Sequence, residues 1–325
     1  MKTCFISRFG GYGDVLHASH VPELIKSYYK VDHITFETGY AGYQILQNNP
    51  FIDKLIYIDT KKLTQNLMTK NWKHQEENHD LFFNLIYTIE KKYCLLEKDT
   101  NYYRSSEWRR EHLGKMNYYD VMTEACGIPD VFYGNRGQMY YPKLEHDQAK
   151  FWVRKQKEKY DADFIILVCL SGSSLHKRFQ QVDSVCSKIL KKYPKALIVL
   201  TGDKDCEDLR FEGERIINKV DKWNFRTVAI MAKYFDCVIS PETGLACVAH
   251  SWDTPTIQLL TAASYSNHCK YAQNAYAIHS PVECSPCHKG PYKYYGCPRI
   301  NNFPACVYFN ENEIMEKVGE VYEQR

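Results

Sequence analysis

At 325 residues the chain is longer than one hydrophobic core usually organises, so we expect two domains of roughly 150 residues each. Apolar residues make up 44% and charged residues 25%, which is typical of a soluble globular protein and excludes a disordered or fibrous one. The net charge is only +3, because 42 Lys and Arg nearly balance 39 Asp and Glu, and this balance argues against a dedicated duplex-binding domain.

The chain carries no recognisable targeting segment. Its start, MKTCFISRFGGYGD, lacks a long apolar run with a cleavage site, and no later segment approaches about eighteen consecutive apolar residues. We therefore predict no signal peptide and no membrane span. Several of the thirteen cysteines, such as Cys4, Cys169 and Cys237, lie in apolar strand-like runs, where a free thiol behaves as a small hydrophobic group. This pattern predicts a cytoplasmic protein.

The first half of the chain predicts alternating strands and helices. A buried strand over 3–7 leads into a turn with three glycines, and one amphipathic helix is expected over about 14–29. A further helix stops at Asn49-Pro50. Additional strands are expected over 33–37, 54–59 and 81–87. Such alternation is typical of a parallel sheet with helices on both faces.

The alternation restarts in the second half. A charged helix over about 145–160 precedes an apolar strand over 164–170, which ends in SGSS and a helix that carries Lys177. Later strands are expected over 196–200, over 237–240 and after Pro255, with helices over 225–233 and 245–251. We predict an α/β fold of two Rossmann-like, doubly wound domains, residues 1–158 and 159–310, and a helix within 311–325 that docks back on a domain.

The first motif is GGYGDVLHASH at 10–20. Glycines after a strand let the backbone approach a ligand, and a helix start attracts anions and acceptor hydroxyls. Asp14 stands at the carboxyl end of the first strand, where open α/β sheets place ligands. Alternatively, Asp14 only caps the helix.

Two further motifs follow strands of the second half. SGSSLHKRF at 171–179 forms a phosphate cradle with Lys177 as its positive charge, or else a serine-rich turn with a solvated lysine. SPETGLACVAH at 240–250 places Glu242 at a strand end and Thr243 and Gly244 at a helix start, which offers amides to a diphosphate, or else only caps the helix. All three motifs fall at strand carboxyl ends, so they predict a ligand-binding cleft between the two domains.

A fourth pattern is formed by four cysteines. Cys284, Cys287, Cys297 and Cys306 lie within the loop 284–306, open with C-x-x-C and are interspersed with Gly, Pro and aromatic residues. Four thiolates at such spacing indicate a tetrahedral structural site for zinc or iron. The alternatives are disulfides, which a cytoplasmic protein disfavours, and unrelated buried thiols.

The order GYGDVLHASHVPEL, NNPFIDKLIYID, GSSLHKRF and VISPETGLACVAHSWDTPTIQLL resembles glycosyltransferase family 9, the ADP-heptose:lipopolysaccharide heptosyltransferases and their relatives, over essentially the whole chain. The resemblance implies a GT-B fold with an N-terminal acceptor domain, a C-terminal nucleotide-sugar donor domain, an inverting reaction and no catalytic metal. It implies that Asp14 is the general base and that Lys177, with Ser173, contacts the phosphates. Relatives that glycosylate autotransporter proteins are similar in carrying a four-cysteine iron site.

The resemblance also implies a set of donor-binding residues. Thr243, Gly244 and Leu245 correspond to the diphosphate-binding helix start, and Trp223 to an apolar contact with the base. We add four residues to the expected donor site, Gly13, Ser171, Gly202 and Glu242. The chain departs from the family twice, with Glu242 where Asp is usual and Cys247 where His is usual. The second change, at Cys247, removes a hydrogen-bond donor near the phosphates.

Three functions compete at this point. The first is transfer of a heptose or related sugar from a nucleotide-diphosphate donor, ADP-heptose or a UDP-sugar, to a lipopolysaccharide or other surface glycan. The second is transfer to a modified base in DNA, or to a protein hydroxyl; for DNA the basic and aromatic cluster over 102–115 would contact phosphates, unless it is a solvated segment or a glycan-binding loop. The third is a non-catalytic nucleotide-sugar binding module, which the presence of Asp14 and Lys177 argues against.

Overall fold

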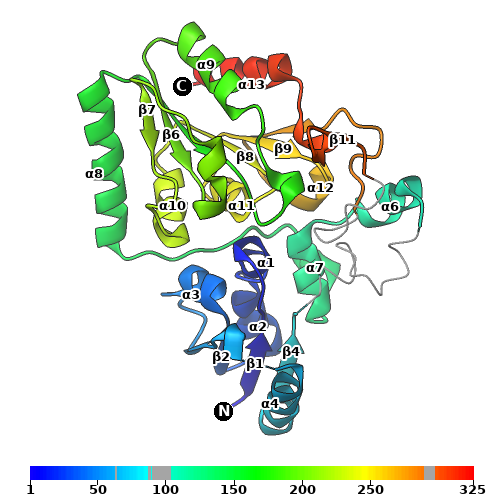
Figure 1. Ribbon diagram of the computed structural model, residues 1–325. Coiled ribbons are helices and arrows are strands. Elements are labelled where there is room, and N and C mark those ends of the chain that lie inside the picture. Colours follow the sequence, from blue (N-terminus) through cyan, green and yellow to red (C-terminus); the bar gives the residue numbers. More distant parts are fainter. Residues whose placement is uncertain (63, 87–88, 90–103, 289–296) are drawn as a thin grey trace. The chain divides into compact units, whose positions relative to one another are not determined.

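The protein forms two compact α/β units (Figure 1). The structure, a computed structural model, describes residues 1–62, 64–86, 89, 104–288 and 297–325. The first unit comprises Met1–Ile89 and Asn117–Pro142, and the second comprises Glu90–Met116 and Lys143–Arg325. No helix among the described residues is both long and apolar enough to cross a membrane.

The first unit is built on a four-stranded parallel sheet in the order β3-β2-β1-β4. Its strands are β1 (Thr3–Ser7), β2 (His33–Thr38), β3 (Lys54–Tyr57) and β4 (Leu81–Asn84). Its helices are α1 (Tyr12–Leu16), α2 (Val21–Tyr29), α3 (Tyr40–Leu46), α4 (Gln65–Asn78) and α7 (Tyr118–Ala125), with short 3-10 turns η1 (Thr60–Lys62) and η3 (Asp130–Phe132). Fully buried Ile6, Ile34 and Phe36 on β1 and β2 supply the sheet's part of the core.

The single helix predicted over 14–29 is wrong, because the chain forms two helices there. Helix α1 ends at Leu16, and α2 begins at Val21 with Pro22 in its first turn. A proline has no amide hydrogen to continue a helix and its ring collides with the preceding turn, so it is tolerated only at a helix start. The intervening residues instead form backbone hydrogen bonds between residues three apart, such as Ala18 N to Val15 O (3.0 Å). The break keeps α1 as a short element directly after β1.

The second unit contains a six-stranded parallel sheet in the order β10-β9-β8-β5-β6-β7. Its strands are β5 (Phe164–Cys169), β6 (Ala196–Thr201), β7 (Ile216–Asn218), β8 (Cys237–Pro241), β9 (Thr256–Leu260) and β10 (Ala275–His279), and a separate antiparallel pair joins β11 (Arg299–Ile300) to β12 (Phe303–Pro304). From β5 the chain runs outward through β6 and β7, then crosses to β8 on the other side. The order therefore reverses between β5 and β8, which is where doubly wound sheets bind ligands.

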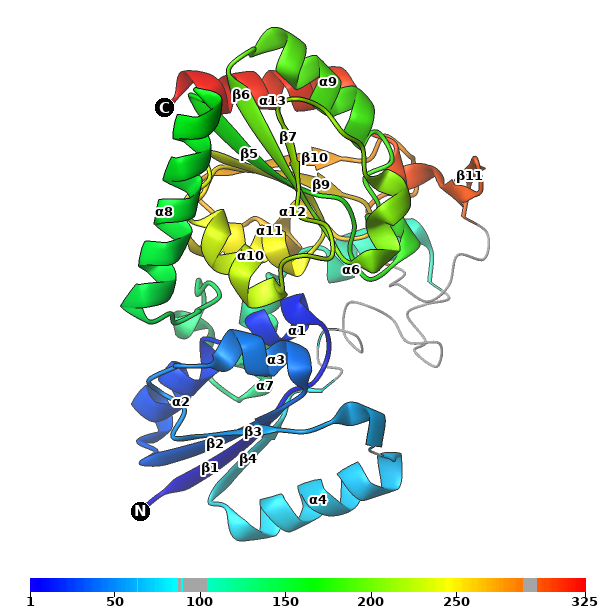
Figure 2. The ribbon, with the colours of Figure 1, turned by 60° about the vertical axis from the view of Figure 1, so that its left-hand side comes forward.

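Helices cover both faces of this sheet (Figure 2). Helices α9 (Val182–Lys192) and α13 (Glu311–Glu323) pack on one face, and α10 (Phe225–Ala232), α11 (Gly244–Ser251) and α8 (Lys143–Tyr160) lie on the other. The remaining elements among the described residues of this unit are α6 (Ser106–Leu113), α12 (Tyr265–His268), η4 (Leu175–Lys177), η5 (Lys204–Leu209) and η6 (Ala305–Val307). Ile314, Val318 and Val321 of α13 join the core of this unit. The α/β class with two Rossmann-like parallel sheets is confirmed.

The division between the units differs from the one expected at 158–159. It lies between Pro142 and Lys143, so that α8 belongs wholly to the second unit. Glu145 at its start forms a two-point ion pair with Arg226 of α10 (2.9 and 3.0 Å). Near its end, Lys157 contacts Asp236 at 2.7 Å. The charged sequence of α8 is typical of a linker helix, and only these tertiary contacts attach it to one unit.

Candidate functional site

The loop after β5 is folded tightly around Gly172. The Gly172 amide donates to the Lys177 carbonyl (3.1 Å), and Phe179 N donates back to Leu170 O (2.9 Å). A β-carbon at Gly172 would lie 2.9 Å from Lys177 Cδ and 3.1 Å from Thr243 Cγ2. Only glycine fits there without displacing a neighbour. Gly172 therefore lets the β5 loop, with Lys177, pack directly against the residues that follow β8.

Lys177 does not lie on the helix predicted after SGSS, and that prediction is wrong. It ends the 3-10 turn η4, in which Lys177 N donates to Ser174 O (2.9 Å), whereas α9 begins at Val182. The apolar spacing that defines an amphipathic helix starts only at Val182, because Phe179 is drawn back toward the sheet. Within the loop Ser171 is half-buried and its hydroxyl donates to Gly172 O (3.0 Å), while Ser173 is exposed.

The residues after β8 form a capped helix start. Thr243 is the N-cap of α11; its hydroxyl lies 3.5 Å from Ala246 N and 2.8 Å from Ser240 Oγ. Gly244 is the first residue of α11, and the buried Leu245 anchors this turn in the core. The first amides of a helix have no partner inside it, and they carry the positive end of its dipole. This turn, together with the charge of Lys177 from the loop after the neighbouring strand β5, suits a diphosphate.

Glu242 is buried and organises the turn that follows β9. Its Oε1 accepts hydrogen bonds from the amides of Thr261, Ala262 (2.7 Å) and Ala263 (3.0 Å). Burial raises the pKa of Glu242, while the charge of Lys177 and the three amides oppose this rise. The carboxylate therefore stabilises the turn 261–263, a structural role that its position in the sequence beside a helix start does not indicate. Its place in the donor-binding site remains a prediction.

Two other predicted donor-binding residues lie elsewhere in this unit. Gly202 follows β6, and a β-carbon there would lie 2.8 Å from Cys206 Sγ, so the close packing of the turn requires glycine. Trp223 precedes α10 and packs edge-on against Trp152 at 4.9 Å, with the Lys219 ammonium 5.3 Å from its ring. An aromatic surface is therefore present near the start of α10, and its contact with a base stays a prediction.

In the first unit Asp14 combines a cap with a partly exposed carboxylate. Its Oδ2 accepts from Gly11 N (2.7 Å), and its Oδ1 lies 3.6 Å from the buried Arg8 guanidinium. Gly10 has φ +126°, and a β-carbon there would collide with the Asp14 carboxylate at 2.7 Å. Gly13 lies inside α1. The capping interpretation of Asp14 is thus present in the structure, yet 36% of its side chain stays exposed for a second role.

Buried polar residues that the motifs did not single out lie near Asp14. Arg8 donates to Leu85 O (2.8 Å) and to Asp14 O (3.2 Å), so the guanidinium holds the start of α1 against the chain after β4. Glu37 on β2 accepts from Ser7 Oγ (2.9 Å) and from Trp72 Nε1 (3.2 Å). In the sequence, these two residues are marked by a charge directly after an apolar strand (Arg8) or inside one (Glu37). Both charges lie near the carboxyl edge of this sheet, on the same side as Asp14.

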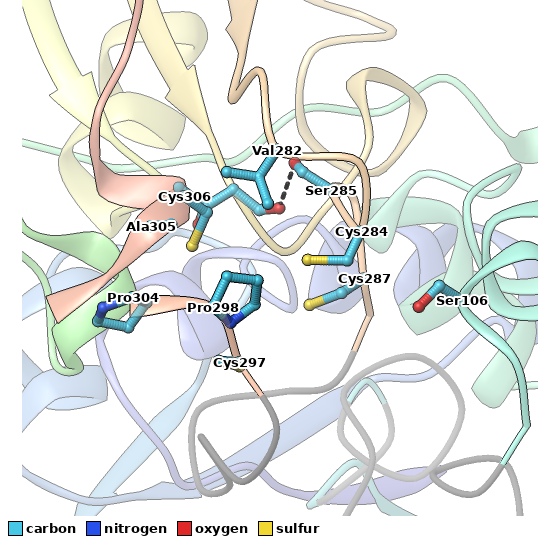
Figure 3. Close-up of a pocket in the computed structure, with 11 residues that line it drawn as sticks. Ser106, Val282, Cys284, Ser285, Cys287, Cys297, Pro298, Pro304, Ala305 and Cys306 are labelled. Carbon is cyan, nitrogen blue, oxygen red and sulfur yellow. Dashed lines mark hydrogen bonds between the residues drawn. The ribbon is translucent and has the colours of Figure 1, made fainter. Parts of the chain in front are cut away.

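The four cysteines of the loop 284–306 line one cavity of about 230 Å³ in the second unit (Figure 3). The sulfurs of Cys284, Cys287 and Cys306 point toward the space between them. Burial raises the pKa of the Cys306 thiol, and Cys287, Glu242, Cys284 and Cys297 add to the rise. Among the described residues these sulfurs do not form a closed coordination cluster. Such a set of soft donors suits zinc or iron.

Helix α6 and the β9 turn hold this loop in place. Arg109 is almost fully buried and donates to Cys287 O (2.6 Å), and Arg110 donates to Glu283 O (3.0 Å). From the other side Ser285 Oγ donates to Thr261 O (2.7 Å). Two arginines of the basic cluster over 102–115 therefore bind the protein's own carbonyls, and the buried Arg109 is withdrawn from the surface expected to contact DNA. Residues 102 and 103 of that cluster lie outside the described residues.

Comparison with known proteins identifies the fold. No protein-family model and no curated protein matches the sequence. Among solved structures, a family 9 glycosyl transferase from Veillonella parvula is 16% identical with a TM-score of 0.68, over 100% of this chain and 98% of that chain. Escherichia coli ADP-heptose lipopolysaccharide heptosyltransferase II is 11% identical with a TM-score of 0.64, over 100% and 99% of the chains. The chain thus has a GT-B fold.

A third similar structure is the iron-containing dodecameric glycosyltransferase TibC from enterotoxigenic E. coli. It is 10% identical with a TM-score of 0.62, over 99% of this chain and 76% of that chain. At these identities the likeness shows the fold alone. The resemblance to glycosyltransferase family 9 that the motifs carry is confirmed at the level of fold.

Proposed function

We propose that the chain is an inverting glycosyltransferase that moves a sugar from a nucleotide-diphosphate donor to a hydroxyl acceptor. The observation that carries this proposal is that the Lys177 side chain and Thr243, the N-cap of α11, both pack against Gly172 at the reversal point of the second sheet. A lysine ammonium and the first amides of a helix both favour an anionic ligand such as a diphosphate over an apolar one. The fold shared with glycosyltransferases supports the same reaction.

In this mechanism the second unit holds the donor and stabilises the leaving group. As the bond from the sugar to the diphosphate breaks, negative charge grows on the departing phosphate oxygen, and Lys177 and the α11 amides compensate it. No catalytic metal is required for this task. Asp14 of the first unit takes the proton of the acceptor hydroxyl, whose oxygen attacks the anomeric carbon from the opposite face. The configuration at that carbon is therefore inverted.

For the donor we propose ADP-heptose or a UDP-sugar, and for the acceptor a lipopolysaccharide or another surface glycan. The E. coli structure named above is an ADP-heptose lipopolysaccharide heptosyltransferase, which supports this choice. The test is incubation of purified protein with ADP-heptose, UDP-glucose or UDP-N-acetylglucosamine and with deacylated glycan, DNA or protein acceptors, followed by mass spectrometry. A sugar-sized mass increase on the glycan is expected. An increase on DNA or protein alone would move the acceptor to that class, and none with any pair would overturn transfer.

We also propose that the four cysteines hold a structural zinc or iron ion. Their common cavity, the soft thiolate donors and the polar anchoring of the loop by Arg109 support this proposal, as does the iron in TibC. When bound, the ion would cross-link the loop and contribute its binding energy to folding. Its four protein ligands would leave no open catalytic position.

The metal prediction is tested with Cys287→Ser. The wild-type protein should contain about one equivalent of zinc or iron by elemental analysis, and the variant should lose it and melt at a lower temperature. Cys126→Ala is the matched control, because Cys126 is buried in the first unit, so that its loss lowers stability but leaves the metal content unchanged. Metal-free wild-type protein, prepared without chelator, would contradict the site.

A further inference from the structure

Helix α12 brings a histidine to the start of α11. His268 is the last residue of α12, and its Nδ1 lies 3.7 Å from Cys247 Sγ. Cys247 lies one turn into α11, where its amide donates to the carbonyl of the N-cap Thr243 (3.4 Å). The imidazole is thus held beside the first turn of α11, the same turn that presents its amides at the reversal point of the sheet.

The surroundings of His268 keep its ring neutral. Burial, together with the charge of Lys177 and the electrostatic effect of His250 and His288, lowers its pKa to about 3. A neutral imidazole carries one N–H group and one acceptor nitrogen. If the Cys247 thiol donates to Nδ1, the ring proton is placed on Nε2, in the way that a fixed partner at one nitrogen selects the tautomer of the other. His268 then offers an N–H donor within electrostatic reach of Lys177.

We propose that His268, oriented by Cys247, is a further binding residue for the donor diphosphate and donates a hydrogen bond from Nε2 to a phosphate oxygen. This inference rests on the proposed function. It accounts for the departure at position 247, where the resembled family usually has histidine. The chain carries a thiol there, and a different helix supplies an imidazole against that thiol. The side chain that donates a hydrogen bond to the phosphate is thus supplied by α12 and not by α11. Cys247 becomes the residue that positions it.

The test is calorimetric titration of ADP and UDP, with adenosine and uridine as phosphate-free probes. His268→Ala should weaken the binding of the preferred nucleoside diphosphate about tenfold, because a hydrogen bond to a charged group is lost, and should leave nucleoside binding unchanged. His268→Gln should recover part of the loss, since its amide can donate. His279→Ala is the matched control: His279 is exposed at the end of β10, and its loss should leave both affinities unchanged.

An exchange variant separates the imidazole's chemistry from its packing. Cys247→His combined with His268→Ala should restore most of the diphosphate affinity lost in His268→Ala. The inference is overturned if folded His268→Ala binds the diphosphate as the wild type does, if it loses nucleoside and diphosphate binding equally, or if neither His268→Gln nor the exchange variant recovers affinity. A wild-type protein that binds no nucleoside diphosphate and no nucleotide sugar would instead overturn the proposed function, and the inference with it.

Discussion

Asp14 caps the start of α1 and, in the proposed mechanism, also acts as the general base. Its carboxylate closes the start of α1 by accepting the Gly11 amide at 2.7 Å, and Arg8 lies close to the other oxygen. An asparagine can still accept the amide through its carbonyl oxygen, whereas it cannot take a proton from an acceptor hydroxyl. The two duties can therefore be separated by one substitution.

Asp14→Asn is expected to abolish transfer while donor affinity stays within a few-fold of the wild type, because a general base acts only in the chemical step. Turnover is measured by release of nucleoside diphosphate, and donor affinity by calorimetry. The melting temperature should change little, since the cap is kept. Near-normal turnover would return Asp14 to a purely capping role.

Lys177→Ala is expected to weaken donor binding and turnover together. The phosphates are charged in the bound donor and gain charge as the bond breaks, so the ammonium acts on both states. A reduction of about tenfold or more in donor affinity, with a larger one in kcat/KM, is the expected result. Lys191→Ala on the exposed side of α9 is the matched control. Equal donor titrations for the wild type and Lys177→Ala would contradict the assignment.

At the scale of elements, the turn 261–263 joins three parts of the second unit. Its amides bind Glu242 after β8, the Thr261 hydroxyl donates to His176 O (3.1 Å) beside Lys177, and the Thr261 carbonyl accepts from Ser285 in the cysteine loop. His288 N also donates to Ala262 O (2.8 Å). The phosphate-binding loops and the cysteine loop are thus held by one short segment, whose own geometry depends on Glu242.

Glu242→Asp is expected to lower stability, although aspartate is usual at this position in the resembled family. The shorter side chain cannot reach all three amides of the turn, and buried amides without partners are costly. We expect the free energy of unfolding to fall by about 1–3 kcal/mol. Urea denaturation measures this change, and elemental analysis of the same samples reports whether the cysteine loop retains its metal. An unchanged unfolding midpoint would show that the aspartate reaches the turn.

At the scale of the whole molecule, each unit contains a buried histidine that resists protonation. Burial lowers the pKa of His20 in the first unit to about 3, and burial together with the charge of Lys177 lowers that of His176 in the second unit to about 3. The unfolded chain protonates these rings near the model-peptide value of about 6.5. Stability is therefore fully present above pH 6.5 and is lost as the pH falls from 6.5 toward 3, because the unfolded state binds more protons.

Each of these histidines should cost roughly 2 kcal/mol of stability between pH 7 and pH 5, at up to about 1.4 kcal/mol per pH unit. Urea denaturation at pH 7 and pH 5 measures the total loss. His20→Gln should reduce the loss by about the share of one histidine, because glutamine does not titrate. A free energy of unfolding that is equal at pH 7 and pH 5 would contradict the buried neutral state.

The class of fold and the main parts of the expected site could be predicted from the order of residues alone. Apolar runs of strand length alternating with amphipathic helices allow little other than parallel α/β units, and glycine, hydroxyl and charged residues directly after strands mark the carboxyl edges. The break at Pro22 is local, because a proline is tolerated only at a helix start. The tertiary structure was needed to show that Lys177 lies on a tight turn and that α8 belongs to the second unit. It also decided that Glu242 holds the turn 261–263 and that His268 lies against Cys247. These last pairs are distant along the chain, and packing, not local propensity, brings them together.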